Sequence, residues 1–200
     1  MTLPKQIRFG TYVAKIVYEK LSRDHDYYAT NINKQQLTIF TEYPIETVKY
    51  EFFEGILALL IGYLIKITVD GKFCHEAFCR VLYSVLRQNP DLIKRKINES
   101  IIILGKRFDI CYQSQLHSPN ITGEIDYSFS KIFFQEGMAD RQMFAVFWHE
   151  VIHEIFHVID ESFNKEDLVH QLAILVSELL YGNDLSWIFE DKKDDSPKVD

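Results

Sequence analysis

The segment 149–153 is the part of the sequence best suited to chemistry. It reads His-Glu-Val-Ile-His, so two imidazoles are four residues apart and Glu150 follows the first of them. On a helix, residues at this spacing share a face, and both rings can reach one Zn²⁺ at about 2.0–2.1 Å. Glu150 would stand beside the metal and act as general base toward an activated water. The pattern predicts zinc-dependent hydrolysis of peptide bonds.

The residues around this motif favour a metal over a chance match. Apolar side chains dominate the segment from Phe144 to Phe156. Imidazoles and a carboxylate are costly to bury without partners, and a metal would satisfy them. Glu154 departs from this pattern, because an apolar residue is usual after the second histidine. We expect Glu154 on a partly exposed edge of the helix.

The third ligand of the metal must come from another segment, since a hydrolytic zinc takes three protein ligands and keeps one position open. Glu166 begins the next predicted helix, and His170 lies one turn further along the same face. An antiparallel helix pair would bring either side chain back toward His153. His157 is another candidate, but ligands at i, i+4 and i+8 drift around one helix axis. We favour Glu166, with His170 as the alternative, although an acid at a helix start is also favoured by the helix dipole.

A few further residues are candidates for supporting roles. Tyr127 and Tyr181 are near the motif in sequence, and either could donate a hydrogen bond to an oxyanion. Asp160 opposes the helix dipole where it stands, and a hydrogen bond to a ligand histidine would explain its position. His75 and His117 are isolated, and we expect structural or solvated roles for them.

The segments around the motif predict an α+β fold, in which a small mixed sheet packs on the motif helix and the helix after it. Runs of β-branched and aromatic residues alternate with turn signals, and two later segments have helical periodicity. The expected elements are strands at 101–104 and 108–112, a hairpin of 124–127 and 131–134, and helices at 141–161 and 166–180.

The first half of the chain repeats this order at a shift of roughly 92 to 95 residues, which suggests a duplicated unit. In this alignment Leu57 and Ile61 stand where the second half has its two histidines, so the first copy is degenerate and lacks metal residues. We therefore expect a degenerate repeat at 1–95, a zinc-binding unit at 96–189 and a disordered acidic tail at 190–200. The elements expected in the first half are strands at 6–9, 12–18 and 37–40, a loop at 22–35, and helices at 44–66 and 73–87.

With these residues in view, segment 100–185 resembles the small phage-type zincin-like (gluzincin-like) metallopeptidases. The resemblance rests on the order and spacing of the first strand at 101–106, the segment 123–127, the motif and the helix from Glu166. It implies zinc held by His149 and His153, Glu150 as base, and a third ligand in the following helix. It also implies that an edge strand near 132–134 aligns an extended peptide. His170 departs from the family, because an acidic residue is common at that position.

Composition narrows the remaining classes of function. The net charge is −7 and the basic residues are scattered, which argues against a nucleic-acid partner. Three cysteines without a pairing pattern favour a reducing compartment, and no apolar run reaches the ~20 residues that a bilayer span needs. We expect a cytoplasmic enzyme (in the host cytoplasm if phage-encoded) that acts on a peptide or protein. The alternative is a non-catalytic zinc-containing module that binds another protein.

Overall fold

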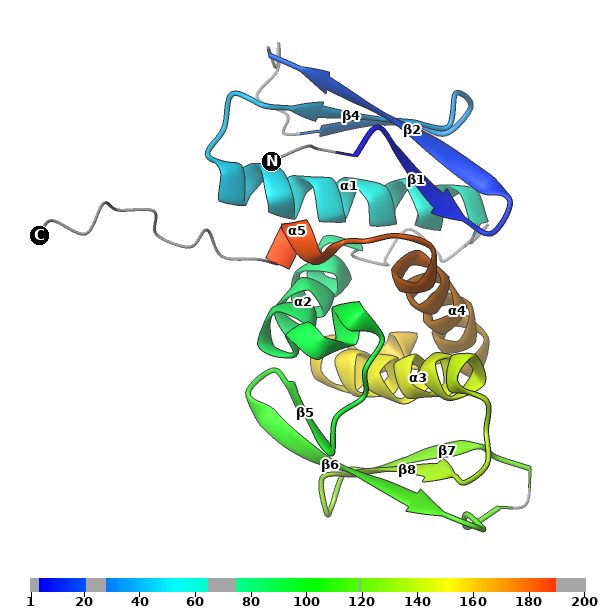
Figure 1. Ribbon diagram of the computed structural model, residues 1–200. Coiled ribbons are helices and arrows are strands. Elements are labelled where there is room, and N and C mark those ends of the chain that lie inside the picture. Colours follow the sequence, from blue (N-terminus) through cyan, green and yellow to red (C-terminus); the bar gives the residue numbers. More distant parts are fainter. Residues whose placement is uncertain (1–3, 21–27, 65–74, 119, 190–200) are drawn as a thin grey trace, which may run out of the picture.

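The computed structural model describes residues 4–20, 28–64, 75–118 and 120–189. It is a mixed α+β structure in which two four-stranded sheets lie on the outside and the helices lie between them (Figure 1). The strands are β1 (Gln6–Phe9), β2 (Tyr12–Glu19), β3 (Tyr28–Asn31), β4 (Gln36–Phe40), β5 (Ser100–Ile103), β6 (Lys106–Gln113), β7 (Gly123–Asp126) and β8 (Lys131–Gln135). The helices are α1 (Ile45–Leu64), α2 (His75–Gln88), η1 (Pro90–Lys94), α3 (Asp140–Ile159), η2 (Glu161–Phe163), α4 (Glu166–Gly182) and α5 (Ser186–Phe189).

The two sheets have the same topology. The first has the order β1-β2-β4-β3 and the second β5-β6-β8-β7, each with one parallel pair between two antiparallel pairs. Their registers also agree. Lys15 pairs with Gln36 in the first sheet and Asp109 with Lys131 in the second, so the residue numbers differ by 94 and 95. Helices α1 and α3 are both 20 residues long and start 95 residues apart.

Two expectations about the strands were wrong. The segment 22–35 was expected to be a loop, yet it contains β3, whose polar and exposed residues give no apolar alternation. The strand near 132–134 was expected at the edge of its sheet, but β8 lies between β6 and β7. The edge strands of this sheet are β5 and β7, and all four residues of β7 are half-buried. The predicted hairpin of these two strands is confirmed.

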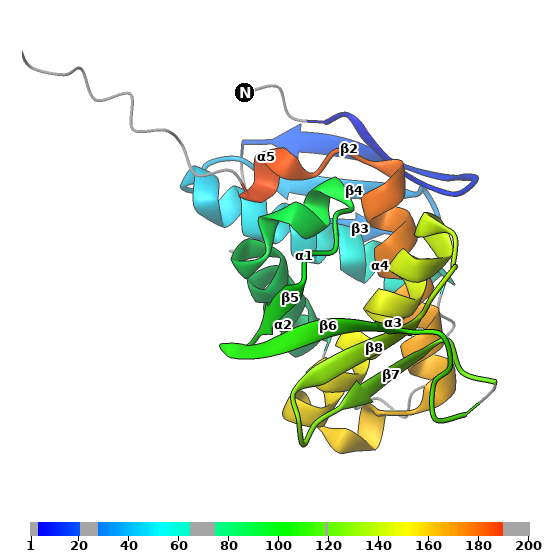
Figure 2. The same ribbon diagram turned by 60° about the horizontal axis from the view of Figure 1, so that its bottom comes forward.

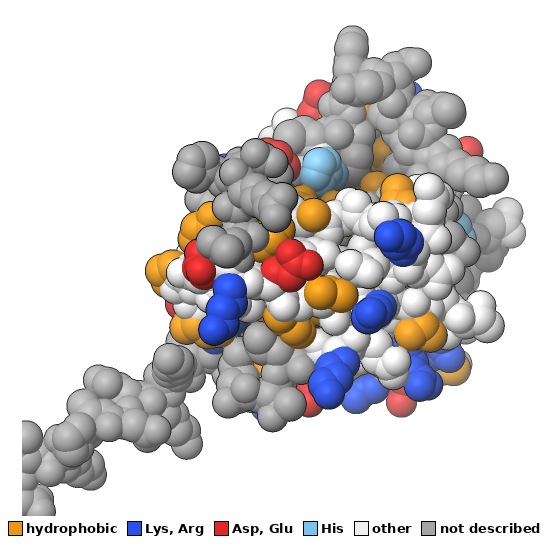
Figure 3. All heavy atoms as spheres, turned by 90° about the horizontal axis from the view of Figure 1, so that it is seen from above, with side chains coloured by type: hydrophobic (Ala, Val, Ile, Leu, Met, Phe, Trp, Pro, Cys, Tyr) orange, Lys and Arg blue, Asp and Glu red, His pale blue; other side chains and the backbone are white. Residues whose placement is uncertain are grey.

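Alternation along β2 explains why one face of the first sheet is buried. Tyr12, Ala14 and Ile16 point inward and are buried, whereas Val13 and Lys15 point outward and are exposed. Seen from above, this outer face carries scattered Lys and Arg side chains with apolar ones between them (Figure 3). Among the described helices, none has both the length and the apolar character needed to cross a bilayer.

Each half of the chain packs a helix onto the sheet of the other half. Helix α2 contacts β5, and α4 contacts β1, which Figure 2 shows at the upper end of α4. Buried residues of both halves form one continuous core. The boundary expected near residue 95 lies between η1 and β5, and the parts of the chain on either side of it share one core.

Two asparagines attach α2 and α4 to the sheet of the other half in the same way. At the end of α2, Asn89 accepts from the backbone N–H of Ile102 at 2.9 Å and donates to its carbonyl at 2.7 Å. At the end of α4, Asn183 forms the equivalent pair with Arg8 at 2.8 and 2.7 Å. Both pairs of residues are related by the same shift of 94 positions. The contacts are reciprocal, as in an isologous interface within one chain.

Candidate metal centre

Three side chains from α3 and the start of α4 converge on one point. The Nε2 atoms of His149 and His153 lie 3.0 Å apart. Glu166 places Oε1 3.0 Å from the first Nε2 and Oε2 3.4 Å from the second. Antiparallel packing of α3 and α4 after a short connection produces this meeting, because it returns the first turn of α4 to the exposed face of the motif. His149 and His153 are half-buried at this point, and Glu166 is exposed.

The spacing of these atoms fits a single zinc ion. Two donors that are each about 2.05 Å from a tetrahedral metal are roughly 3.3 Å from one another. The three observed separations bracket this value, and all three ligand atoms lie within 4.8 Å of one another. Two imidazoles and one carboxylate are also a donor set that a hydrolytic zinc uses. The residues present therefore fit the metal.

The other two candidates for third ligand lie outside this group. His170 is close, with its ring centroid 6.0 Å from that of His149, but it is not among the three converging residues. His157 turns away and hydrogen-bonds Glu161 through Nδ1 at 2.9 Å. Its ring stacks on Tyr127 with centroids 4.7 Å apart. The rotation of residues around α3 separates His157 from the site, as its i+8 spacing predicted.

Glu150 lies beside the three donors and is only 6% exposed. Burial and the nearby Glu166 and Glu124 carboxylates raise its pKa to about 8. Burial, with the neighbouring His153, lowers the pKa of His149, so the neutral ring needed for a metal ligand is favoured at neutral pH. A cation among the donors would in turn favour the charged form of Glu150.

An open cleft of about 490 Å³ lies over the motif, between β7 and α4. His149, Glu150, His153 and Glu166 all line it. No Lys or Arg is among the described residues that line this cleft. The apolar part of the lining is Ile121, Ile125, Ala145, Val146, Ala173 and Ile174.

The supporting residues expected from the sequence meet different outcomes. Tyr127 lines the cleft, whereas Tyr181 packs on Phe144 and lies under two arginine side chains away from it. Asp160 begins η2 and accepts from the backbone N–H of Ser162, so its position serves a turn. The hydrogen-bond partner of His153 is Asn164, whose Oδ1 lies 2.6 Å from Nδ1.

Glu154 was expected on a partly exposed edge of the helix, and this was wrong. Its side chain is 3% exposed, because it faces the second sheet one turn beyond Glu150. Burial raises the pKa of its carboxyl group, and the Oε2 atom is buried without a hydrogen bond. Amphipathic periodicity could not reveal this, since both sides of α3 are covered.

Gly123, which was not among the site residues predicted from the sequence, shapes the site from β7. A methyl group there would clash with Val146 Cγ1 and lie 2.8 Å from Glu150 Oε1. The strand thus passes directly over the catalytic candidate with no side chain between them. A glycine within a strand is the signal that could have indicated this close approach.

In the first half of the chain, the positions equivalent to the metal ligands, Glu150 and Gly123 hold different residues, and the space over the helix is filled. At the shift of 95 given by strands and helices, Glu54 and Ala58 stand opposite the two histidines, which replaces the expected Leu57 and Ile61. Gly55 then takes the place of Glu150, and Tyr28 takes the place of Gly123. The Tyr28 ring covers Gly55, where a Cβ would lie 3.0 Å from it, and its hydroxyl donates to Glu54 Oε1 at 3.3 Å. An aromatic ring therefore fills the space that is open in the second half.

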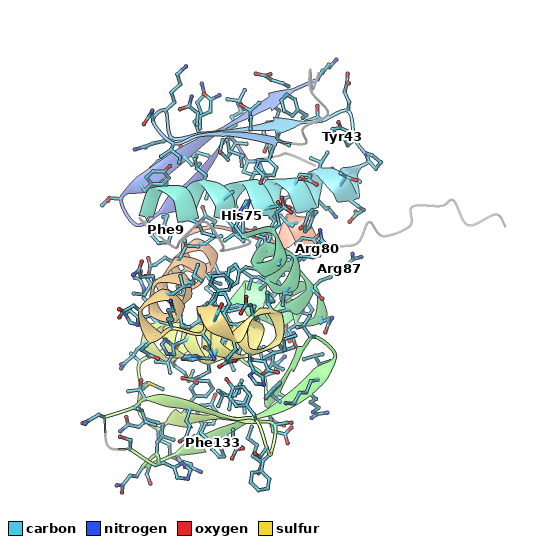
Figure 4. All side chains as sticks on the ribbon, turned by 180° about the vertical axis from the view of Figure 1, so that it is seen from behind. Phe9, Tyr43, His75, Arg80, Arg87 and Phe133 are labelled. Atoms are coloured by element: carbon cyan, nitrogen blue, oxygen red, sulfur yellow. The ribbon has the colours of Figure 1, made fainter. Side chains whose placement is uncertain are left out.

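A second group of possible metal donors lies at the contact of α1 with α2. Glu54, His75 and Glu76 have ligand atoms within 4.8 Å of one another. Figure 4 shows His75 at the beginning of α2, next to α1. Burial and the charges of Glu54 and Glu76 raise the pKa of Glu51 to about 7. This group provides an internal comparison for metal-binding experiments on the first site.

No family model, curated protein or solved structure matches this chain significantly.

Proposed function

We propose that this protein is a zinc-dependent peptidase whose metal ligands are His149, His153 and Glu166. The observation that carries the proposal is the convergence of two imidazole nitrogens and the Glu166 carboxylate, with the buried Glu150 carboxyl beside them. The nitrogens are 3.0 Å apart, and the two Glu166 oxygens lie 3.0 and 3.4 Å from them. Three ligands leave a tetrahedral ion one open position, and the cleft gives access to it. An accessible position is what separates a catalytic from a purely structural zinc.

The chemistry divides between the ion and one side chain. Zinc, when bound, would supply a Lewis acid that lowers the pKa of water and polarises the scissile carbonyl. Glu150 accepts a proton from the attacking water and delivers it to the leaving nitrogen. Its burial strengthens these electrostatic interactions, and Gly123 holds it in place by close packing from above.

The substrate of this cleft is an extended peptide segment that pairs with β7. Among the described strands β7 has a free edge, and its residues line the cleft over the motif. Backbone hydrogen bonds to such an edge would align a peptide across the donor atoms. The absence of Lys and Arg from the described lining disfavours a site for a terminal carboxylate, which supports internal cleavage next to an apolar side chain.

The chain is, in this proposal, a duplication with one active and one degenerate unit. The matching strand order, the matching register and the equivalent hydrogen bonds of Asn89 and Asn183 support a common origin of the halves. In the first unit Tyr28 and Gly55 replace the open space and the base, so that unit has a structural role. Strand β1 of its sheet contacts α4, the helix that carries Glu166.

A non-catalytic zinc module is the second candidate, because His170 lies close to His149. If the His170 ring joined the other three ligands, the open position would close and hydrolysis would be lost. The protein would then use its metal only to hold α3 and α4 together.

Metal analysis combined with a proteolysis assay tests the proposal. Purified protein should contain one zinc per chain and cleave unstructured protein or quenched-peptide libraries. Glu150→Gln should retain zinc and lose cleavage, whereas His149→Ala and His153→Ala should lose both. His75→Ala is the matched control from the second donor group and should retain both. Wild-type protein without zinc, or zinc lost only in the His75 variant, would refute the assignment.

A further inference from the structure

We propose that Asn164 is a positioning residue of this centre, which orients His153 and fixes the loop that presents Glu166. The inference rests on the proposed metal site. Asn164 lies between η2 and α4, two residues before Glu166, and its Oδ1 atom is 2.6 Å from His153 Nδ1. One side chain thus acts on two of the three ligands.

The hydrogen-bond network fixes which way the Asn164 amide faces. Its Nδ2 group donates to Glu161 Oε1 at 2.8 Å, and a carboxylate can only accept. The oxygen of the amide must then face His153, so that ring carries its hydrogen on Nδ1. In the neutral ring, the lone pair is consequently on Nε2, the atom that faces His149 and Glu166.

Glu161 forms a further hydrogen bond through its other oxygen, which extends the network to His157. Its Oε2 atom lies 2.9 Å from His157 Nδ1, and the His157 ring stacks on Tyr127. Asn164 and Glu161 therefore link His153 to His157, which lies one turn further along α3. Partners of this kind typically change metal affinity by 10–100-fold when they are removed.

Metal affinity in asparagine variants tests the inference. Asn164→Ala should weaken zinc binding 10–100-fold in a chelator competition. Asn164→Asp keeps an acceptor for Nδ1 but sets a carboxylate against Glu161, so it should recover most of the lost affinity only when it is combined with Glu161→Gln. Asn183→Ala is the matched control, because this asparagine anchors the other end of α4 through backbone hydrogen bonds. It should lower the melting temperature of the metal-free protein and leave zinc affinity unchanged.

Nitrogen-15 NMR of the His153 ring gives a readout that needs no metal. Metal-free wild-type protein should show the Nδ1–H form, and Asn164→Ala should show a mixture of the two neutral forms. A wild-type ring with hydrogen on Nε2 would overturn the inference, as would equal loss of affinity in the Asn164 and Asn183 alanine variants. Failure of wild-type protein to bind zinc would refute the proposed function instead, with the ring assignment still measured.

Discussion

Gly123 on β7 and Glu150 on α3 are so close that a Cβ on the glycine would lie 2.8 Å from the glutamate Oε1 and 3.2 Å from its Cγ. The edge strand and the catalytic candidate therefore constrain each other directly. A change at Gly123 alters the position of the base without touching any metal ligand.

We expect Gly123→Ala to reduce peptide cleavage strongly while zinc content stays at one per chain. Overpacking costs about 1–3 kcal/mol, and a displacement of the base by about 1 Å can lower the rate about 100-fold. Steady-state cleavage and metal analysis on the same samples check this. Gly55→Ala is the matched control, since it crowds Leu37 and the Tyr28 ring in the first half and leaves the cleft unchanged. Equal loss of activity in both variants would contradict the expectation.

Separate substitutions of Glu166 and His170 should show which of them is the third metal ligand. Glu166→Gln removes the charged carboxylate from the converging group and should lower zinc affinity by at least tenfold. His170→Ala should bind zinc as wild type does, because His170 lies outside the converging group. Isothermal titration with zinc measures both variants. Zinc loss in the His170 variant combined with normal binding in the Glu166 variant would transfer the third ligand to His170.

Glu150→Gln should stabilise the metal-free protein in a pH-dependent manner. The folded-state pKa of Glu150 is about 8, above the ordinary 4.5, so the folded protein binds this proton more tightly than the unfolded chain does. The associated stability is present below pH 4.5 and is lost as pH rises to 8. The variant should exceed wild type by about 1–3 kcal/mol at pH 8 and by little at pH 4.5. Urea unfolding with chelator present measures this, and a difference independent of pH would contradict it.

Zinc affinity should fall as the pH is lowered, because protons compete for the imidazoles. The lowered pKa of His149 means that its ring stays neutral below the ordinary value of 6.5, so the main loss should occur on the acid side of that value. Competition titrations from pH 5 to pH 8 measure the dependence. Affinity that does not change over this range would exclude histidine ligands.

The hydrogen bonds of Asn89 and Asn183 should contribute similarly to the free energy of unfolding. Asn89→Ala and Asn183→Ala each remove hydrogen bonds that hold an exchanged helix to a strand of the other half. Each variant should lose about 0.5–1.5 kcal/mol, because it loses hydrogen bonds that are exposed to solvent. Denaturant titration measures this. A loss confined to one variant would contradict the equivalence of the halves.

Local pattern in the sequence was sufficient for most elements and for the central motif. Start signals and helical periodicity located α1, α3 and α4 to within about two residues, and runs of β-branched and aromatic residues located β2 and β6. The i, i+4 spacing alone placed His149 and His153 on one face. These features depend on neighbours in the chain, so a linear pattern contains them.

Tertiary structure decided what depends on partners distant in sequence. It brought Glu166 to the histidines, left His170 outside the group, and made Asn164 the partner of His153. It also placed β7 at the sheet edge, where Gly123 meets Glu150. The physical reason is that periodicity reports which face of an element is covered, while the packing of α3 against α4 and β7 determines what covers it.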